Sequence, residues 1–343
     1  MKVAFAHSRG LWPLLLTFST STSAIAVTSA SSDIEQNATT TLPQVEVSSE
    51  RSGPQLWKLT RGDHTVWILG TLQPLPKRMI WRSREVGAVL AEAQEVIPYH
   101  FKVEGIGLFS GIRLYFQFRH IRNLPDGQTL KQVLPPALYA RFTALCARYA
   151  GGSRDLERLQ PVLAVQRLRA LAIDRSGLTR AADIQNEVLK LARQRGVKIH
   201  QPQLQVPDAS SILREAGDVS IATQLICVEP VITALEHDLD TLRSRATAWA
   251  DGDVRTLVEH PIVDVESACR EGAADAPRIR ALEQQARDAW TQAVEDALTR
   301  DKTALAVQSI DRLLGPTGWL AQFRAAGYAV EGPEFTGRSA TRP

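Results

Sequence analysis

The sequence lacks the short motifs that mark several large enzyme classes. It has no Gly-x-Ser-x-Gly nucleophile elbow, no Walker-type phosphate loop and no Gly-x-Gly-x-x-Gly dinucleotide fingerprint. Beyond the N-terminus, no apolar run is long enough to cross a bilayer as a helix. The 40 basic and 37 acidic residues are scattered, without the basic run typical of nucleic-acid binding. We therefore expect neither a nucleic-acid partner nor a membrane span in the mature protein.

Cysteine is scarce, with three residues in a chain of 343. Cys146 lies at helical spacing from Phe142 and is predicted to be a buried, free thiol. Cys227 and Cys269 are the expected disulfide pair, because they bracket a long segment of predicted helix. A metal or redox role is the weaker interpretation, since no Cys-x-x-Cys spacing occurs.

The N-terminus has the pattern of a secretory signal peptide. Lys2 and Arg9 precede an apolar stretch at residues 11–18, and Ala24-Ile25-Ala26 supplies a cleavage site. We expect residues 1–26 to be removed and the mature protein to be periplasmic or secreted, a setting that permits disulfides. Residues 27–53 are rich in Ser and Thr and are expected to form a disordered linker, and residues 336–343 a disordered tail.

A β-prone run at residues 65–69 ends in Gly70-Thr71-Leu72-Gln73 and then meets Pro74 and Pro76. Val, Trp and Ile favour a buried strand, Gly70 permits close approach of another chain segment, and the prolines stop the strand. Gln73 is thus predicted at the carboxyl end of a strand, where open α/β sheets hold their ligands.

Alternating strand and helix patterns follow along the chain. Strands are predicted at residues 55–59, 65–69, 95–99, 197–200, 303–307 and 327–330, helices within 83–93, 130–172, 183–195 and 318–326, and one long helix each at 212–245 and 278–299. This order predicts an α/β (α+β) fold: one domain at residues 54–335, with a mixed central sheet flanked by helices and a mostly helical middle segment at about 120–300.

Residues 101–120 have no clear pattern. Glycines interrupt an apolar stretch that carries Phe109, Tyr115, Phe116 and Phe118. Because an aromatic stripe is more often core than binding surface, we expect these side chains to be buried. A loop and helix that form a pocket wall is the alternative.

Read with Leu56-Trp57-Lys58-Leu59, the Gly70 segment resembles the start of the TraB/GumN family, which is related to the TIKI metalloproteases. The resemblance extends from about Leu56 to Val330. It implies the scaffold of a metal-dependent hydrolase, in which members carry two Gly-x-x-His motifs and two carboxylates.

At each of these four family positions, the chain carries a different residue. Gln73 replaces the first histidine, and Arg312, in Ser309-Ile310-Asp311-Arg312 before the turn glycine Gly315, replaces the second. The two carboxylate positions correspond to Tyr99 and Gln203. Arginine has no lone pair for a metal and glutamine is a weak ligand, so we expect no metal and no other cofactor. Instead, the four residues predict a hydrogen-bonding pocket for sugar hydroxyls, a uronic acid, a pyruvate ketal or a peptide carboxylate.

Two functions remain open, beside a structural role in which the protein's own side chains fill the pocket. The first is a catalytically degenerate binding or assembly factor, linked by analogy to exopolysaccharide or envelope processes, with a saccharide, peptide or envelope-protein partner. The alternative is an active periplasmic peptidase or hydrolase that recruits His100, Glu104 or Asp311. His237 and His260, which have acidic neighbours, are interpreted as solvated surface residues.

Overall fold

The computed structural model describes residues 53–333, except for 78, 80–83, 153, 181–183, 261, 263–264, 266–267, 270–275 and 316. These residues belong to one compact unit that begins at Glu50. The expected signal peptide, nearly all of the expected linker and the C-terminal tail lie outside the described residues, as do Ser83 and Asp183 at the expected starts of two helices.

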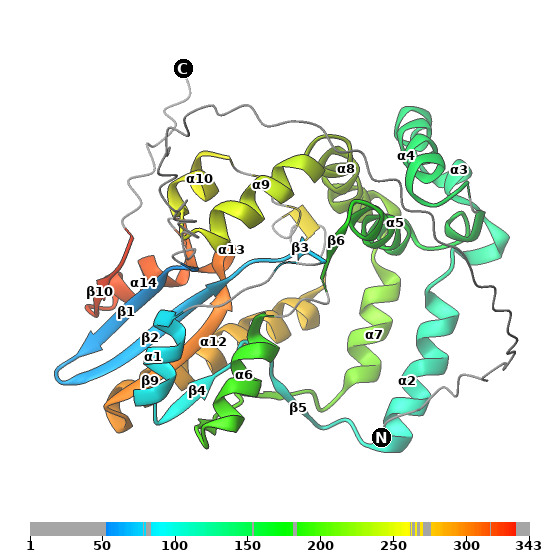
Figure 1. Cartoon of the computed structure of the whole chain (residues 1–343). Helices are drawn as coiled ribbons and strands as arrows, with labels where there is room; N and C mark the ends of the chain where they lie inside the picture. Colours follow the sequence, from blue (N-terminus) through cyan, green and yellow to red (C-terminus); the bar gives the residue numbers. More distant parts are fainter. Residues whose placement is uncertain are drawn as a thin grey trace, which may run out of the picture. The chain divides into compact units, whose positions relative to one another are not determined.

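A six-stranded mixed sheet forms the centre of this unit, in the order β10-β1-β2-β9-β4-β7 (Figure 1). Its strands are β1 Leu56–Arg61, β2 His64–Thr71, β4 Glu95–Ile97, β7 Lys198–Ile199, β9 Thr303–Ser309 and β10 Ala329–Glu331. β1 pairs antiparallel with β2 and β10, whereas β2, β9, β4 and β7 run parallel. The predicted fold class is confirmed.

Parallel pairing brings the ends of distant strands together. In the β2–β9 register, Leu69 lies opposite Val307 and Thr71 opposite Ser309. β4 lies on the other side of β9, with Ile97 opposite Ala306. The segments that follow β2, β4 and β9 therefore leave the sheet at one edge, formed by the carboxyl ends of these strands. Gln73, which follows β2, lies at this edge, where open α/β sheets hold their ligands.

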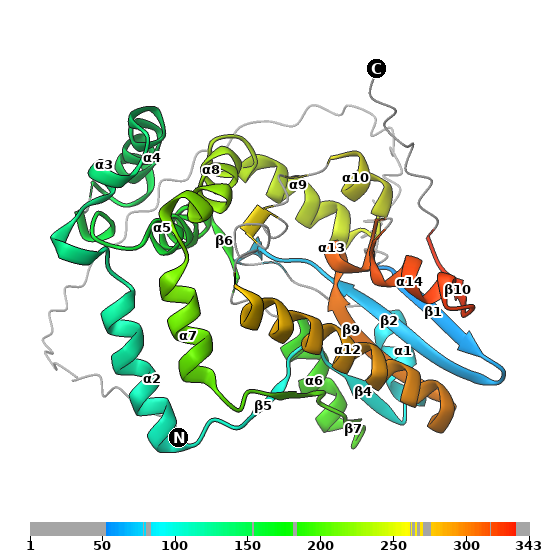
Figure 2. The ribbon, with the colours of Figure 1, turned by 180° about the vertical axis from the view of Figure 1, so that it is seen from behind.

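Helices cover both faces of the sheet. α1 (Arg84–Glu92) and α12 (Pro277–Arg300) lie on opposite faces, as the two views in Figures 1 and 2 show. The others near the sheet are α6 Ile184–Gln194, α9 Leu239–Ala250, α10 Val254–Glu259, α13 Ile310–Leu313 and α14 Trp319–Ala325. Trp57, Trp249 and Trp290 are almost fully buried in this core.

A second hydrophobic core is wholly helical. It is built by α3 Leu130–Val133, α4 Pro136–Tyr149, α5 Pro161–Arg175 and α8 Ile221–His237, with short 3-10 turns at Pro125–Gly127 and Arg154–Leu156. Cys227 and Cys269 form a disulfide in this core, as predicted. Cys146 is free and buried, and burial raises the pKa of its thiol to about 11. That thiol therefore stays protonated at neutral pH.

Two short strand pairs and two further helices complete the described elements. β3 (Leu75–Pro76) pairs with β6 (Leu178–Thr179), and β5 (Lys102–Glu104) pairs with β8 (Gln203–Gln205). α2 (Leu108–Ile121) lies alongside α7 (Ala209–Asp218) in both ribbon views. Of the helices in the described residues, none alone has the length and apolarity to span a membrane; α7 and α8 pass that test only as a bent pair.

Two expectations were wrong. Residues 212–245 do not form one helix: α7, α8 and α9 follow one another, with α7 and α8 bent by 83°. The Ser220 side chain accepts a hydrogen bond from the Thr223 amide and so starts α8 afresh, and Asp238 separates α8 from α9. The aromatics of α2 are not core, since Phe109, Phe116 and Phe118 are all exposed.

Gly70 allows the close packing at the end of β2. A β-carbon on Gly70 would lie 2.9 Å from Cζ3 of Trp57 and 3.1 Å from Cγ1 of Ile310. We predict that Gly70→Ala lowers the free energy of unfolding by about 1–3 kcal/mol through overpacking. Gly87→Ala in α1 is the control, because its β-carbon meets nothing nearer than 4.0 Å. Urea unfolding checks both variants, and equal stability of Gly70→Ala and the wild type would contradict the packing argument.

Candidate functional site

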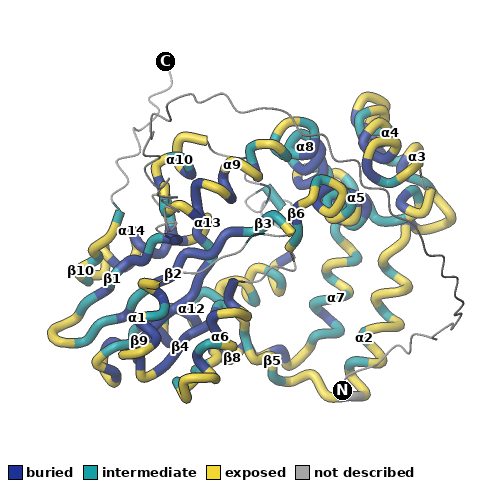
Figure 3. The backbone as a smooth tube through the Cα atoms, in the orientation of Figure 1, coloured by how far each residue is buried: buried dark blue, intermediate teal, exposed yellow. Residues whose placement is uncertain are grey.

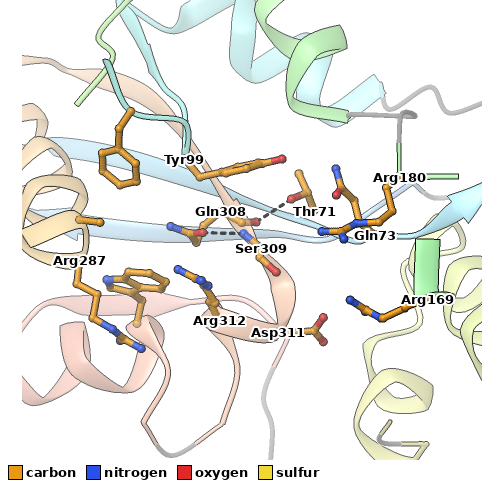
Figure 4. Close-up of a pocket in the computed structure, with 13 residues that line it drawn as sticks. Thr71, Gln73, Tyr99, Arg169, Arg180, Arg287, Gln308, Ser309, Asp311 and Arg312 are labelled. Carbon is orange, nitrogen blue, oxygen red and sulfur yellow. Dashed lines mark hydrogen bonds between the residues drawn. The ribbon is translucent and has the colours of Figure 1, made fainter. Parts of the chain in front are cut away.

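A polar cavity lies at the edge where β2, β4 and β9 end (Figure 4). Its volume is about 340 Å³. The described residues that line it are Thr71, Gln73, Tyr99, Phe101, Arg169, Arg180, Ala286, Arg287, Gln308, Ser309, Asp311, Arg312 and Trp319. Gln73 and Tyr99 thus share one cavity with Arg312, which lies more than 200 residues later in the sequence.

Buried hydrogen bonds fix the floor of the cavity. The Thr71 hydroxyl donates to the Gln308 carbonyl oxygen at 3.2 Å, and the Gln308 side-chain oxygen accepts from the Ser309 amide at 2.9 Å (Figure 4). Behind them, the indole Nε1 of Trp249 donates to the Gly70 carbonyl oxygen at 2.7 Å. The ends of β2 and β9 are therefore held rigidly, so side chains that leave them start from fixed positions.

A buried glutamine holds the turn that carries Tyr99. Gln185 of α6 is fully buried, and its Oε1 accepts a hydrogen bond from the Tyr99 amide at 2.6 Å. Its Nε2 lies 2.6 Å from Nδ1 of His100. α6 thereby positions the backbone from which the Tyr99 ring reaches over the cavity (Figure 4).

Four arginines bring positive charge to the cavity from different elements. Arg169 comes from α5, Arg180 follows β6, Arg287 comes from α12 and Arg312 from α13. The Arg287 guanidinium lies over the Trp319 ring, 5.3 Å from its centroid. Asp311 is the only carboxylate among the described lining residues. Among the described lining residues, guanidinium groups therefore outnumber carboxylates, and they supply donors suited to an anion.

Asp311 is tied to a buried arginine. Its Oδ1 accepts from Nη2 of Arg245 at 2.7 Å, and the Arg245 residue is only 3% exposed. Nη1 of Arg245 also donates to the carbonyl oxygens of Leu257 and His260. One carboxylate oxygen of Asp311 is thus already engaged by a cation.

The other candidate residues lie outside the lining. Gln203 begins β8 opposite Lys102 of β5 and is exposed, because the chain runs past β7 and pairs elsewhere. His100 is exposed next to Gln185. Glu104 is also absent from the lining. Its pKa is lowered, most by a hydrogen bond from Lys102 and less by one from Gln205. Gly315 adopts a positive φ of 85° in the turn after α13, as a turn glycine does.

His237 and His260 are both exposed, and they likewise lie outside the lining of the cavity. Sequence reasoning missed Arg169, Arg180 and Arg287. Each comes from a segment outside the four family positions, and an isolated arginine on a helix or loop has no local pattern that separates it from a solvated one. Only the folding of α5, β6 and α12 around the sheet edge brings them together.

The donor set does not fit a divalent metal. Such ions take imidazole, thiolate or carboxylate ligands, usually three or four of them on converging elements. Within the described residues, no group of three or more His, Cys, Asp or Glu side chains converges in this way. Guanidinium groups would repel a cation at the place where a metal would have to bind.

A model of the TraB/PrgY/gumN family matches residues 55–332 of the chain, which include all described strands. No curated protein and no solved structure matches it significantly.

We predict that Gln185→Leu destabilises the protein by about 1–3 kcal/mol, because the Tyr99 amide loses its buried acceptor. Gln194→Leu on the same helix is the control, since Gln194 is exposed and the change should be nearly neutral. Urea unfolding of both variants measures the difference. Equal stabilities of the two variants would show that Gln185 does not hold the turn.

Proposed function

The chain belongs to the TraB/PrgY/gumN family, and we propose that it is an exported, non-catalytic member that binds a carboxylate-bearing ligand in the arginine-lined cavity. The observation that carries the proposal is the place of Arg312. It lies in the same cavity as Gln73 and Tyr99, at the edge where three parallel strands end.

Charge supports an anionic ligand. A guanidinium can donate two parallel hydrogen bonds to a carboxylate, and it remains charged at any pH that the protein meets. Arg169, Arg180 and Arg312 approach the space under Tyr99 from two sides in Figure 4. A ligand carboxylate placed there accepts charge-assisted hydrogen bonds from the guanidinium groups of the lining.

The remaining lining supports a sugar or peptide body attached to that carboxylate. Tyr99, Phe101 and Trp319 supply flat apolar surface, and Gln73, Gln308 and Ser309 are amides and a hydroxyl that can bond to hydroxyl or amide groups. A volume of about 340 Å³ lies at the small end of ligand pockets. A uronic acid, a pyruvate-ketal sugar or a C-terminal peptide carboxylate has this combination of groups.

Two features of the chain support export. The signal-peptide pattern of residues 1–26 directs the chain out of the cytoplasm. The Cys227–Cys269 pair joins α8 to a segment 42 residues further on, and such bonds persist in oxidising compartments. An acidic polysaccharide or an envelope peptide outside the cytoplasm is the ligand class that fits both location and cavity.

Asp311 favours the alternative of a hydrolase. It is the carboxylate of the cavity lining, and Arg245 orients it at 2.7 Å. A carboxylate held in this way can activate a water molecule as a general base. This function needs turnover, whereas the binding function does not, so the two are separable by experiment.

We predict that Arg312→Gln weakens binding of galacturonate at least about tenfold, because one charge-assisted pair is worth roughly 1.5–3 kcal/mol. Titration calorimetry with galacturonate, pyruvate and neutral galactose measures it. The matched control is Arg324→Gln on α14, an exposed arginine outside the cavity.

Equal affinity for galactose and galacturonate, or no effect of Arg312→Gln, would refute the anion site. The hydrolase alternative is tested in parallel with a peptide library and an oligosaccharide library. Turnover that Asp311→Asn abolishes, with unfolding midpoint unchanged, would replace the binding proposal with that of an enzyme.

A further inference from the structure

α2 exposes an aromatic face that the described part of the chain leaves uncovered. Phe109 is 85% exposed, Phe116 63% and Ile112 51%. In Figure 3 the tube of α2 is mostly yellow and teal, in contrast to the dark blue sheet strands. Val103 and Ile106, just before the helix, are exposed as well. Large apolar side chains gathered on one surface mark an interaction site.

The exposed face is opposite the face that packs on α7. Gly111, Leu114 and Phe118 of α2 share an apolar groove with residues of α7. Gln117 donates to the Ser210 carbonyl oxygen at 2.9 Å, and the Ile121 side chain lies against Gly217. α2 is therefore anchored by one side, and the described residues leave its other side uncovered.

Spacing makes that outer face an amphipathic stripe. At about 100° per residue, Phe109, Ile112 and Phe116 fall within roughly 60° of one another. Arg113 flanks the stripe on one side and Arg119 on the other, both exposed. Long arginine side chains beside an apolar stripe can extend to phosphate groups while the stripe enters an apolar phase.

The charged residues of α2 itself have one sign. From Gly105 to Leu124 the chain carries Arg113, Arg119, His120 and Arg122, and no Asp or Glu. The nearest preceding carboxylate, Glu104, is paired with Lys102 at 3.0 Å. The outer face of α2 therefore combines exposed aromatics with basic residues, and the segment from Gly105 to Leu124 carries no acidic residue.

We propose that α2 is a docking helix for an anionic phospholipid surface. The helix lies in the plane of the membrane, its stripe of Phe109, Ile112 and Phe116 enters the boundary between headgroups and acyl chains, and the flanking arginines bind lipid phosphates. Aromatic and apolar residues on one face with arginines beside them are what an interfacial helix requires.

Charge complementarity favours an anionic phospholipid surface over a second copy of the chain as the partner of α2. A twofold dimer places the same patch against itself, so the basic flanks of one stripe would face those of the other. Like charges across an interface are destabilising. The phosphate groups of a lipid surface neutralise the same arginines. Binding to such a surface requires no specific shape complementarity.

The test is vesicle flotation of the chain from Val27 onward, which keeps all described elements and omits the apolar stretch of residues 11–18. Vesicles of phosphatidylcholine alone are compared with vesicles rich in phosphatidylglycerol, at low and high salt. We expect binding to the anionic vesicles that weakens with salt. The Phe109→Ser, Phe116→Ser double variant should reduce the partition coefficient at least about tenfold.

The substitutions Arg113→Gln and Arg119→Gln should each reduce the partition coefficient about fivefold on anionic vesicles. On neutral vesicles they should hardly change it. Val258→Ser in α10 and Arg324→Gln in α14 are matched exposed controls and should leave binding unchanged. Absence of flotation with anionic vesicles would overturn the proposal. So would a lipid-free dimer that the double phenylalanine variant dissociates, because the stripe would then be a protein interface.

Discussion

The parallel pairing of β2 with β9 is the constraint on which the candidate site depends. It sets Thr71 beside Ser309 across 237 residues of intervening chain, and the bond from Trp249 to the Gly70 carbonyl oxygen locks the end of β2 against the helices. Gly70 makes this possible because any larger residue would meet Trp57 and Ile310. With β4 on the other side of β9, the chain segments after three strands converge, and Gln73, Tyr99 and Arg312 become neighbours.

The same geometry can serve opposite chemistries, and the side chains decide which. Imidazoles and carboxylates at the end of a sheet would concentrate ligands for a cation, whereas arginines from α5, α12 and α13 and from the loop after β6 concentrate donors for an anion. Compared with a neutral imidazole at the same position, Arg312 by itself adds one positive charge. Arg169, Arg180 and Arg287 add three further guanidinium groups to the described lining, and the carboxylate of Asp311 is paired with the buried Arg245.

The six strands of the central sheet could be predicted from sequence, most of them because an apolar run ends near a glycine or proline, whereas the short strands β3, β5, β6 and β8 were not predicted. The convergence of Gln73 with Arg312 followed from the family resemblance. The Cys227–Cys269 bond followed from counting cysteines. The long helix at residues 212–245 was wrong because the cap at Ser220 competes with a continuous apolar pattern. The aromatics of α2 were predicted to be core, since residue type alone does not say whether a neighbouring element covers a helix face. The position of Gln203 could not be predicted either. It depends on the pairing of β8 with β5, which joins residues 101 positions apart in the sequence and leaves no local sequence pattern.

Metal content tests the central claim most directly. The chain from Val27 onward is dialysed against zinc, manganese, nickel and iron(II), then washed and measured by elemental mass spectrometry. A Gln73→His, Arg312→His double variant, which restores imidazole at both positions, is measured beside it. The account predicts far less than one equivalent of each metal in the wild-type protein. One equivalent bound by the wild-type protein, and lost on substitution of Asp311, would show that the cavity holds a cation and would contradict the account.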